Sequence, residues 1–146
     1  MAIDMALIVM SHGDFAKGAM QSAELILGAQ ENYKVVTLTP SQGRADILEA
    51  MRKASSELDT SRGLILMVDF KGGTTSSIAG EIVLTQDDTY AFCGFSLPIL
   101  LECLANREEE IDVIEACIFE RHKTSFCNLG DLLKSEYSEG GDEDGY

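Results

Sequence analysis

The chain is poor in basic residues: 11 lysines and arginines stand against 25 aspartates and glutamates, which gives 146 residues a formal net charge of −14. Such a surface repels phosphate backbones and anionic lipid, so we expect neither nucleic-acid binding nor membrane-surface binding. Because no apolar run reaches about 18 residues, we expect no membrane insertion. Asp4 interrupts the apolar start, so the layout of a signal peptide is missing and we expect a cytoplasmic protein.

Motifs for metals, nucleotides and flavins are missing as well. The four cysteines form no C-x-x-C pair, and the spacing Cys117-x4-His122-x4-Cys127 fits no common zinc pattern. There is no P-loop motif for nucleotide phosphates and no acidic pair at a strand end that would hold magnesium. The absence of tryptophan and the few aromatic residues in loops disfavour a flavin site. We therefore expect no metal and no cofactor.

Strand patterns and helix patterns alternate along the chain. Short apolar runs predict strands over residues 5–10, 34–38, 63–68 and 90–93. Apolar residues three and four apart predict helices over residues 15–27, 47–58, 75–83 and 98–104, and a fifth helix with Glu108, Glu109, Glu110 and Asp112 in its first turn. We therefore expect an α/β fold: an open, doubly wound, mainly parallel sheet of about four strands flanked by helices, with the flavodoxin-like order 2-1-3-4.

The C-terminal segment differs from the rest in composition. Residues 134–146 include five acidic residues and three glycines, and they have almost nothing to bury. Such a composition is typical of a disordered segment. We therefore divide the chain into a domain over residues 1–130 and an acidic, disordered tail over residues 131–146.

The residues that follow the predicted strands are the candidates for function, because ligands bind beyond the carboxyl ends of strands in such sheets. His12 follows the first strand. Its imidazole is either a functional group at the edge of the sheet, or it only forms local hydrogen bonds where the chain enters the next helix. Asp69 follows five apolar residues, where a carboxylate is costly unless it is paired. If the two strands are neighbours, Asp69 reaches His12, selects one tautomer and leaves the other nitrogen nucleophilic. Alternatively, Asp69 caps the following loop.

A Gly-Gly-Thr-Thr segment, residues 72–75, opens the helix that comes next. Gly72 and Gly73 leave backbone N–H groups free to face an anion, and the helix N-terminus adds positive potential. The hydroxyl of Thr74 or Thr75 can cap the helix or donate to a phosphate. Together with His12 and Asp69, this segment predicts a phosphohistidine site with a nucleophile, an orienting carboxylate and an anion cradle. Without a nucleotide motif, the phosphoryl donor would be another protein.

Four stretches carry a family resemblance: IVMSHGDFAKG (residues 8–18), AELILG (23–28), GLILMVDFKGGTT (63–75) and GFSLPILLE (94–102). They resemble the IIA component of the mannose family of the bacterial phosphoenolpyruvate-dependent sugar phosphotransferase system (PTS), along about residues 5–120. The resemblance implies a mannose-family EIIA domain over residues 1–130, an open α/β sheet and a homodimer.

The same resemblance implies a function and assigns residues to it. The protein would be a phosphotransferase in which His12 is phosphorylated by the phosphocarrier HPr. It would pass the phosphoryl group to a IIB component for sugar uptake, with the membrane subunits IIC and IID involved indirectly. Asp69 would be the hydrogen-bond partner of His12, and Gly72, Gly73 and Thr74 would line the phosphate site. The alternative is a regulatory IIA-like module whose phosphorylation state controls a partner protein rather than transport.

This sequence departs from the family pattern at several positions. The family often has Gly-Gly-Ser-Pro where this chain has Thr74 and Thr75 after the glycines, so the helix start loses a proline but keeps a hydroxyl. Ser96 replaces a frequent asparagine, which removes an amide that could contact a partner. Lys71 stands where apolar or aromatic residues are frequent, and we expect it to be solvated.

Overall fold

A computed structural model describes residues 3–138, which form one parallel sheet between two layers of helices. The elements in chain order are β1 (Ala6–His12), α1 (Phe15–Leu27), β2 (Tyr33–Leu38), α2 (Arg44–Ser56), β3 (Leu64–Val68), α3 (Gly73–Thr85), β4 (Thr89–Cys93), α4 (Leu97–Ala105), α5 (Ile111–Ser125) and α6 (Leu129–Ser138). The four strands lie in the order β2-β1-β3-β4, and each neighbouring pair is parallel. The predicted fold class and strand order are confirmed.

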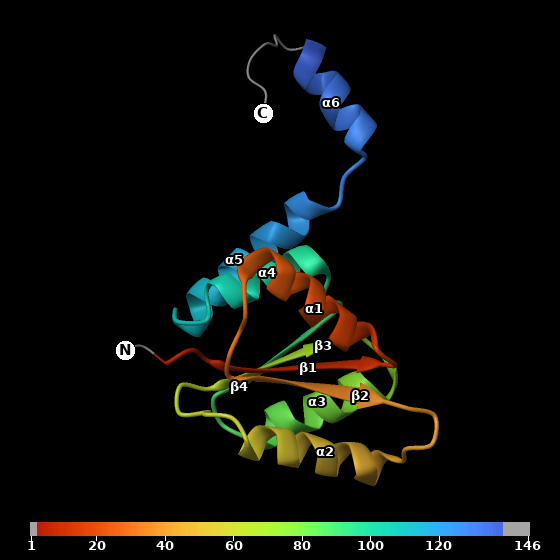
Figure 1. Cartoon of the computed structure of the whole chain (residues 1–146), viewed down its shortest axis with the longest axis vertical. Coiled ribbons are helices and arrows are strands. Elements are labelled where there is room, and N and C mark those ends of the chain that lie inside the picture. The colour runs from red at the N-terminus through yellow and green to blue at the C-terminus, as the bar shows by residue number, and fades with distance from the viewer. Residues whose placement is uncertain (1–2, 139–146) are drawn as a thin grey trace.

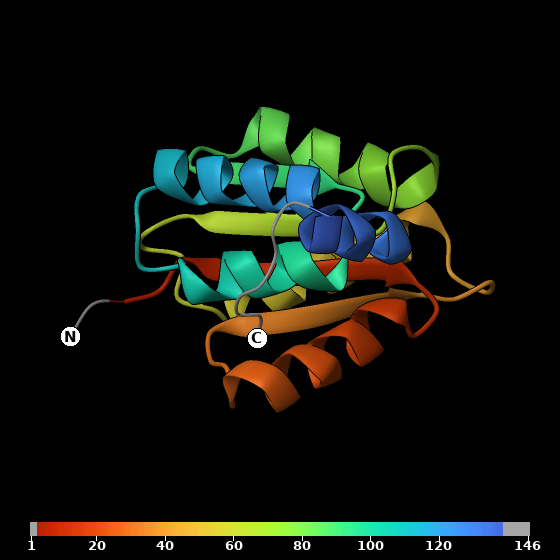
Figure 2. The ribbon, with the colours of Figure 1, turned by 90° about the horizontal axis from the view of Figure 1, so that it is seen from above.

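Two apolar cores lie on the two faces of the sheet. Helices α1, α4 and α5 cover one face, and α2 and α3 cover the other (Figures 1 and 2). Side chains alternate along a strand, so Leu7 and Val9 belong to the first core while Ile8 and Met10 belong to the second. Because both faces of β1 and β3 are buried, these strands are continuous apolar runs in the sequence, and this is the pattern that made them predictable.

Two arginines close the amino end of the sheet. Arg107 is 1% exposed, and its guanidinium donates hydrogen bonds to the backbone carbonyls of Met5, Glu31 and Asn32. Arg62 donates to the carbonyls of Ile3, Glu108 and Glu109. Burial lowers the pKa of Arg107, although nearby Asp4 opposes this effect. The arginines therefore join segments that are far apart in sequence at the end of the sheet opposite to the predicted site.

The start of α5 differs from the prediction. The helix begins at Ile111, so of the four acidic residues expected in its first turn only Asp112 lies there, and Glu110 is the residue before the helix. The backbone carbonyls of Glu108 and Glu109 accept hydrogen bonds from Arg62, which holds this segment as a loop. The acidic run therefore belongs to the connection between α4 and α5.

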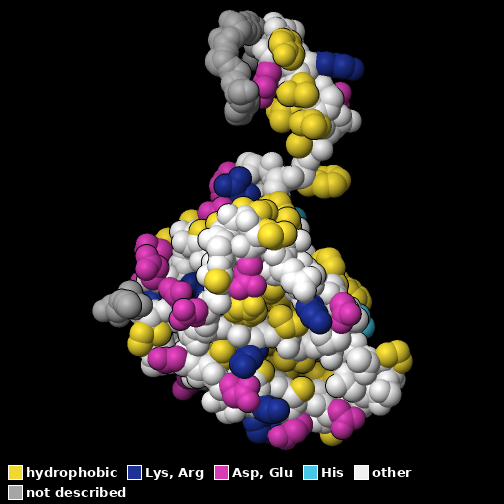
Figure 3. All heavy atoms as spheres, viewed as in Figure 1, with side chains coloured by type: hydrophobic (Ala, Val, Ile, Leu, Met, Phe, Trp, Pro, Cys, Tyr) yellow, Lys and Arg dark blue, Asp and Glu magenta, His cyan; other side chains and the backbone are white. Residues whose placement is uncertain are grey.

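The C-terminal segment contains a helix that the sequence analysis did not predict, because residues 131–138 belong to α6. Its apolar side chains recur three and four residues apart, which is the pattern of an amphipathic helix, and they are exposed: Leu129, Leu132, Leu133 and Tyr137. Helix α6 has no buried residue and extends away from the layers around the sheet (Figures 1 and 3). Residues 139–146 of the predicted tail lie outside the described residues.

Membrane-spanning helices were not expected. Within residues 3–138, no helix combines the length and the apolar character that crossing a bilayer requires.

Candidate functional site

The two residues at the centre of the site follow neighbouring parallel strands. Met10 of β1 is paired with Val68 of β3, so the chain segments just beyond them leave the sheet side by side. His12 donates its backbone N–H to Oδ2 of Asp69 at 2.9 Å, and its imidazole Nδ1 lies 2.8 Å from the same oxygen. The predicted contact between His12 and Asp69 is therefore present in the structure.

This contact distinguishes the two nitrogens of the His12 imidazole. An ionised carboxylate only accepts hydrogen bonds, so Nδ1 carries the proton and Nε2 keeps its lone pair. The His12 side chain is 47% exposed, whereas that of Asp69 is 10% exposed. The arrangement therefore presents a nucleophilic nitrogen to the surface, with a nearly buried carboxylate behind it.

Asp69 is held by several hydrogen bonds. Its Oδ1 accepts hydrogen bonds from the Phe70 backbone N–H and from the Thr75 hydroxyl, both at 3.1 Å. Partial burial raises the pKa of Asp69, but the hydrogen bonds from the His12 backbone, the His12 ring and Thr75 outweigh it and leave the pKa below its ordinary value. Asp69 is therefore a carboxylate at neutral pH, as the proposed tautomer requires.

Thr75 has a role that was not recognised from the sequence. The alternatives considered there were a helix cap and a phosphate donor, but its side chain is fully buried and its hydroxyl donates to Asp69. The six-residue separation between Thr75 and Asp69 does not by itself predict a hydrogen bond between them. The contact forms because the turn between β3 and α3 folds back on the end of the strand.

The turn that contains His12 is held by Ser11. This buried side chain accepts a hydrogen bond from the Ala16 backbone N–H at 2.7 Å, and its hydroxyl donates to the Gly13 carbonyl at 3.1 Å. Ser11 thus satisfies a free donor of the first turn of α1 and closes the loop that presents the imidazole. A serine directly before a histidine at a strand end is the signal in the sequence that could have suggested this role.

The glycine turn leads into the N-terminus of α3. Gly72 and Gly73 have φ angles of +119° and +72°, which residues with a side chain rarely adopt. The N–H of Gly72 donates to Oγ of Ser76 at 2.7 Å, so Ser76 already uses one donor of the predicted cradle. Gly73 and Thr74 lie in the first turn of the helix, where backbone N–H groups have no partner within the helix. These groups and the exposed Thr74 side chain remain suited to an anion.

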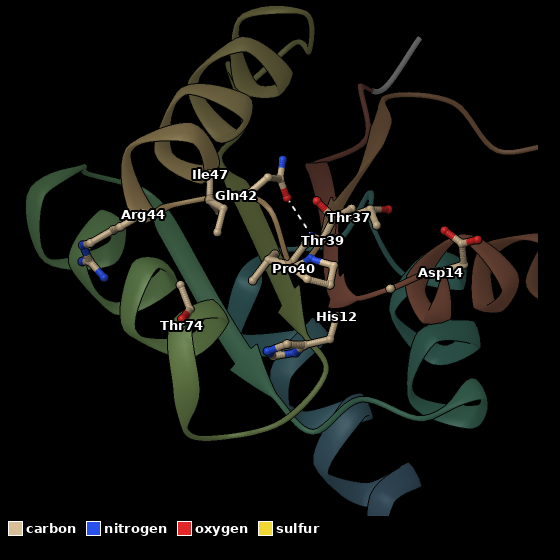
Figure 4. A pocket seen from close by; sticks show the side chains of 11 residues that line it. His12, Asp14, Thr37, Thr39, Pro40, Gln42, Arg44, Ile47 and Thr74 are labelled. Carbon is tan, nitrogen blue, oxygen red and sulfur yellow. Dashed lines mark hydrogen bonds between the residues drawn. The ribbon is translucent and has the colours of Figure 1, made fainter.

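A cleft of about 620 Å³ opens beside His12 (Figure 4). Its polar walls come from the end of β1, from β2 and the β2–α2 connection, and from the start of α2 and α3: His12, Asp14, Thr37, Thr39, Gln42, Arg44 and Thr74. In Figure 4, Thr74 lies between His12 and the guanidinium of Arg44, which is bonded to Ser77 and Glu81 on α3. The wall from β2 and α2 was not predicted, because it contains no recognisable motif.

Other residues that were considered from the sequence lie outside this centre. His122 is exposed in the last turn of α5 and does not line the cleft. Ser96 caps α4 by accepting the backbone N–H of Ile99, and Lys71 is exposed. Over residues 3–138, no three histidine, cysteine or acidic side chains are grouped so that they could hold a metal ion.

The chain is similar to known proteins over the region that builds this site. The sequence profile of the family described as PTS system fructose IIA component matches residues 6–117. The chain is 29% identical over 105 residues to the PTS system mannose-specific EIIAB component of Escherichia coli K12, over 72% of this chain and 32% of that protein. The chain therefore spans about a third of the length of that relative.

Two further relatives are matched over most of their own length. The chain is 28% identical over 103 residues to the PTS system fructose-specific EIIA component of Bacillus subtilis, over 70% of each chain. The crystal structure of the PTS IIA protein associated with the fucose utilization operon from Streptococcus pneumoniae superposes with a TM-score of 0.80 and 25% identity, over 90% of this chain and 98% of that one.

Proposed function

The chain belongs to the family of PTS system fructose IIA components, and on this premise we propose that it is a cytoplasmic phosphoryl carrier of the sugar phosphotransferase system. His12 accepts a phosphoryl group from HPr and passes it to a IIB component, which serves sugar uptake through the membrane subunits IIC and IID. We further propose that the protein acts as a homodimer. The observation that carries the proposal is the 2.8 Å contact between Nδ1 of His12 and Asp69, which leaves Nε2 free.

The transfer step requires one nitrogen–phosphorus bond to form as another breaks. The lone pair on Nε2 of His12 attacks the phosphorus of phospho-HPr, and the HPr imidazole leaves with the electron pair of the broken bond. The His12 ring keeps its proton on Nδ1 and therefore carries positive charge in the product. Asp69 lies against that proton and stabilises the charge, so the carboxylate favours the phosphorylated state. Transfer to IIB is the same step with the roles exchanged.

The N-terminus of α3 and the cleft supply the rest of the site. We propose that the N–H groups of Gly73 and Thr74 and the Thr74 hydroxyl donate to phosphoryl oxygens, while the Gly72–Ser76 hydrogen bond holds the turn. The cleft, at about 620 Å³, is much larger than a phosphoryl group needs. We propose that it receives the segment of the partner that carries the phosphoryl group.

The test is phosphorylation from phosphoenolpyruvate with enzyme I and HPr. We expect His12→Ala to accept no label and to stay folded, because a side chain at the rim contributes little packing. His122→Ala is the matched control, since it removes the second imidazole from an exposed position on α5. Label retained in the His12 variant, or lost in the His122 variant, would contradict the assignment.

A chase with the IIB component tests the second half of the proposal. Phosphorylated protein is separated from HPr and mixed with IIB, and we expect the label to move to IIB. Label that is accepted at His12 but passed to no IIB component would favour the regulatory alternative.

A further inference from the structure

Phe70 contacts both parts of the site. Its ring centroid lies 5.3 Å from that of the His12 imidazole, and the two ring planes are inclined by 30°. The ring also lies close to the glycine turn, because a Cβ placed on Gly72 or Gly73 would lie 3.8 or 3.7 Å from its Cε2 or Cζ atom. The ring therefore lies beside both the nucleophile and the glycine turn.

The orientation of the His12 imidazole needs a second contact. The bond from Nδ1 to Asp69 fixes one atom of the ring, but the second side-chain torsion of histidine has broad minima. The imidazole is also 47% exposed, so few other side chains restrict its plane. A ring packed against its face removes this freedom, and aromatic pairs prefer defined arrangements at such centroid distances.

The base of the Phe70 side chain is itself anchored. The backbone N–H of Phe70 donates to Oδ1 of Asp69 at 3.1 Å, so the carboxylate that orients His12 also holds the residue that packs on it. Yet the phenyl ring is 50% exposed and therefore contributes only part of the burial that a core phenylalanine would. A large apolar side chain that is half exposed and packed on the nucleophile is better placed to orient it than to stabilise the fold.

We propose that Phe70 is a positioning residue that sets the plane of the His12 imidazole, so that Nε2 points toward the N-terminus of α3. The proposal rests on the proposed phosphoryl transfer at His12 and adds a residue to it. Asp69 determines which ring nitrogen reacts, and Phe70 determines the direction in which that nitrogen points.

The experiment is a saturation series in which the initial rate of His12 phosphorylation is measured against the concentration of phospho-HPr. Phe70→Ala removes the ring, and we expect the maximal rate to fall about three- to tenfold, the range that corresponds to losing one aromatic pair, at an unchanged half-saturating concentration. Phe70→Tyr keeps the aromatic face and should restore the rate.

Phe15→Ala is the matched control for removing an exposed ring. The Phe15 ring is 53% exposed and stacks on Phe95, with centroids 5.2 Å apart, so this variant should keep the maximal rate. A raised half-saturating concentration with a normal maximal rate in Phe70→Ala would make Phe70 a docking residue and overturn the proposal. A saturation curve for Phe70→Ala that matches the wild type would overturn the proposal as well.

A spectroscopic measurement separates this inference from the proposed function. Nitrogen NMR of the unphosphorylated protein reports the tautomer of His12 directly. Because Asp69 selects the tautomer, we expect the Nδ1–H form to dominate in the wild type, in Phe70→Tyr and in Phe70→Ala. Nuclear Overhauser contacts between the His12 ring and the backbone N–H groups at the start of α3 should be the same in the wild type and in Phe70→Tyr and should weaken in Phe70→Ala. If the wild type accepts no phosphoryl group, the proposed function fails. If these ring contacts are the same in all three proteins, the positioning role fails by itself.

Discussion

The two ends of the sheet use charged and titratable side chains in opposite ways. At the amino end, Arg107 is 1% exposed and its guanidinium binds three backbone carbonyls. At the carboxyl end, the His12 side chain is 47% exposed and bonds through one ring nitrogen only. The comparison shows that a buried side chain with several fixed partners holds this fold together, whereas an exposed side chain with one fixed partner remains available for chemistry.

The difference follows from the direction of the chain. In a parallel sheet with connecting helices, the helices end near the amino end of the strands, where their last carbonyls lack partners. Donors such as Arg62 and Arg107 satisfy carbonyls of the loops at this end. The helices begin at the carboxyl end, where free N–H groups favour anions. His12 and the glycine turn lie at that end, so the site occupies the side of the sheet that is suited to phosphate.

The largest effect that we predict is on stability at the amino end. Arg107→Met keeps an apolar stem but removes a fully buried guanidinium that donates to the carbonyls of Met5, Glu31 and Asn32, so the free energy of unfolding should fall by roughly 3 to 5 kcal/mol. Urea unfolding measures this change. Arg52→Met is the control, because the Arg52 side chain is 70% exposed in its pair with Glu49 and its loss should change stability by no more than about 0.5 kcal/mol. A wild-type midpoint for Arg107→Met would show that the amino end is not held by this side chain.

The next effect is on the rate at the carboxyl end. Asp69→Asn keeps the size of the side chain but removes its charge, and its amide no longer enforces the Nδ1–H tautomer of His12. We expect phosphoryl transfer to slow by roughly ten- to a thousandfold, with the fold retained. The rates to and from HPr are measured for Asp69→Asn and Asp69→Ala. If both variants transfer at the wild-type rate, Asp69 only caps its loop and the two ends of the sheet do not differ as described.

The smallest effect concerns Thr75 and depends on pH. The lowered pKa of Asp69 means that its ionised form stabilises the folded state above the ordinary pKa of 3.8, and that this contribution is lost as the pH falls through the lower folded pKa. Thr75→Val removes one of the hydrogen bonds that lower the pKa, without changing the volume of a buried side chain. The variant should therefore lose about 1 kcal/mol at neutral pH.

Urea unfolding at several pH values checks this prediction. The deficit of Thr75→Val relative to the wild type should shrink as the pH falls below about 3.8. Thr74→Val, which alters an exposed hydroxyl, should show no such dependence. A deficit that stays constant with pH would mean that the Thr75 hydroxyl stabilises the turn without acting on the Asp69 carboxylate.

Much of the site was predictable because it depends on strand ends. Apolar runs identified β1 and β3, and polar residues that follow such runs must emerge at the same edge of a parallel sheet. This reasoning predicted that Asp69 would reach His12. The amphipathic spacing in α6 was equally visible in the sequence, but the acidic and glycine-rich composition around it led to a prediction of a disordered tail in place of the helix.

The sequence by itself determined the strands, the glycine turn and the position of His12 and Asp69, because each depends on residues a few positions apart. Around this pair, only the tertiary structure decided which other groups come into contact. The Thr75 hydroxyl reaches Asp69, the Arg62 guanidinium keeps Glu108 out of α5, and the Phe70 ring packs on His12. Such contacts depend on how the turns close and on strand register. These contacts join groups whose separation along the chain does not determine their distance in space. Periodicity and composition therefore do not predict them.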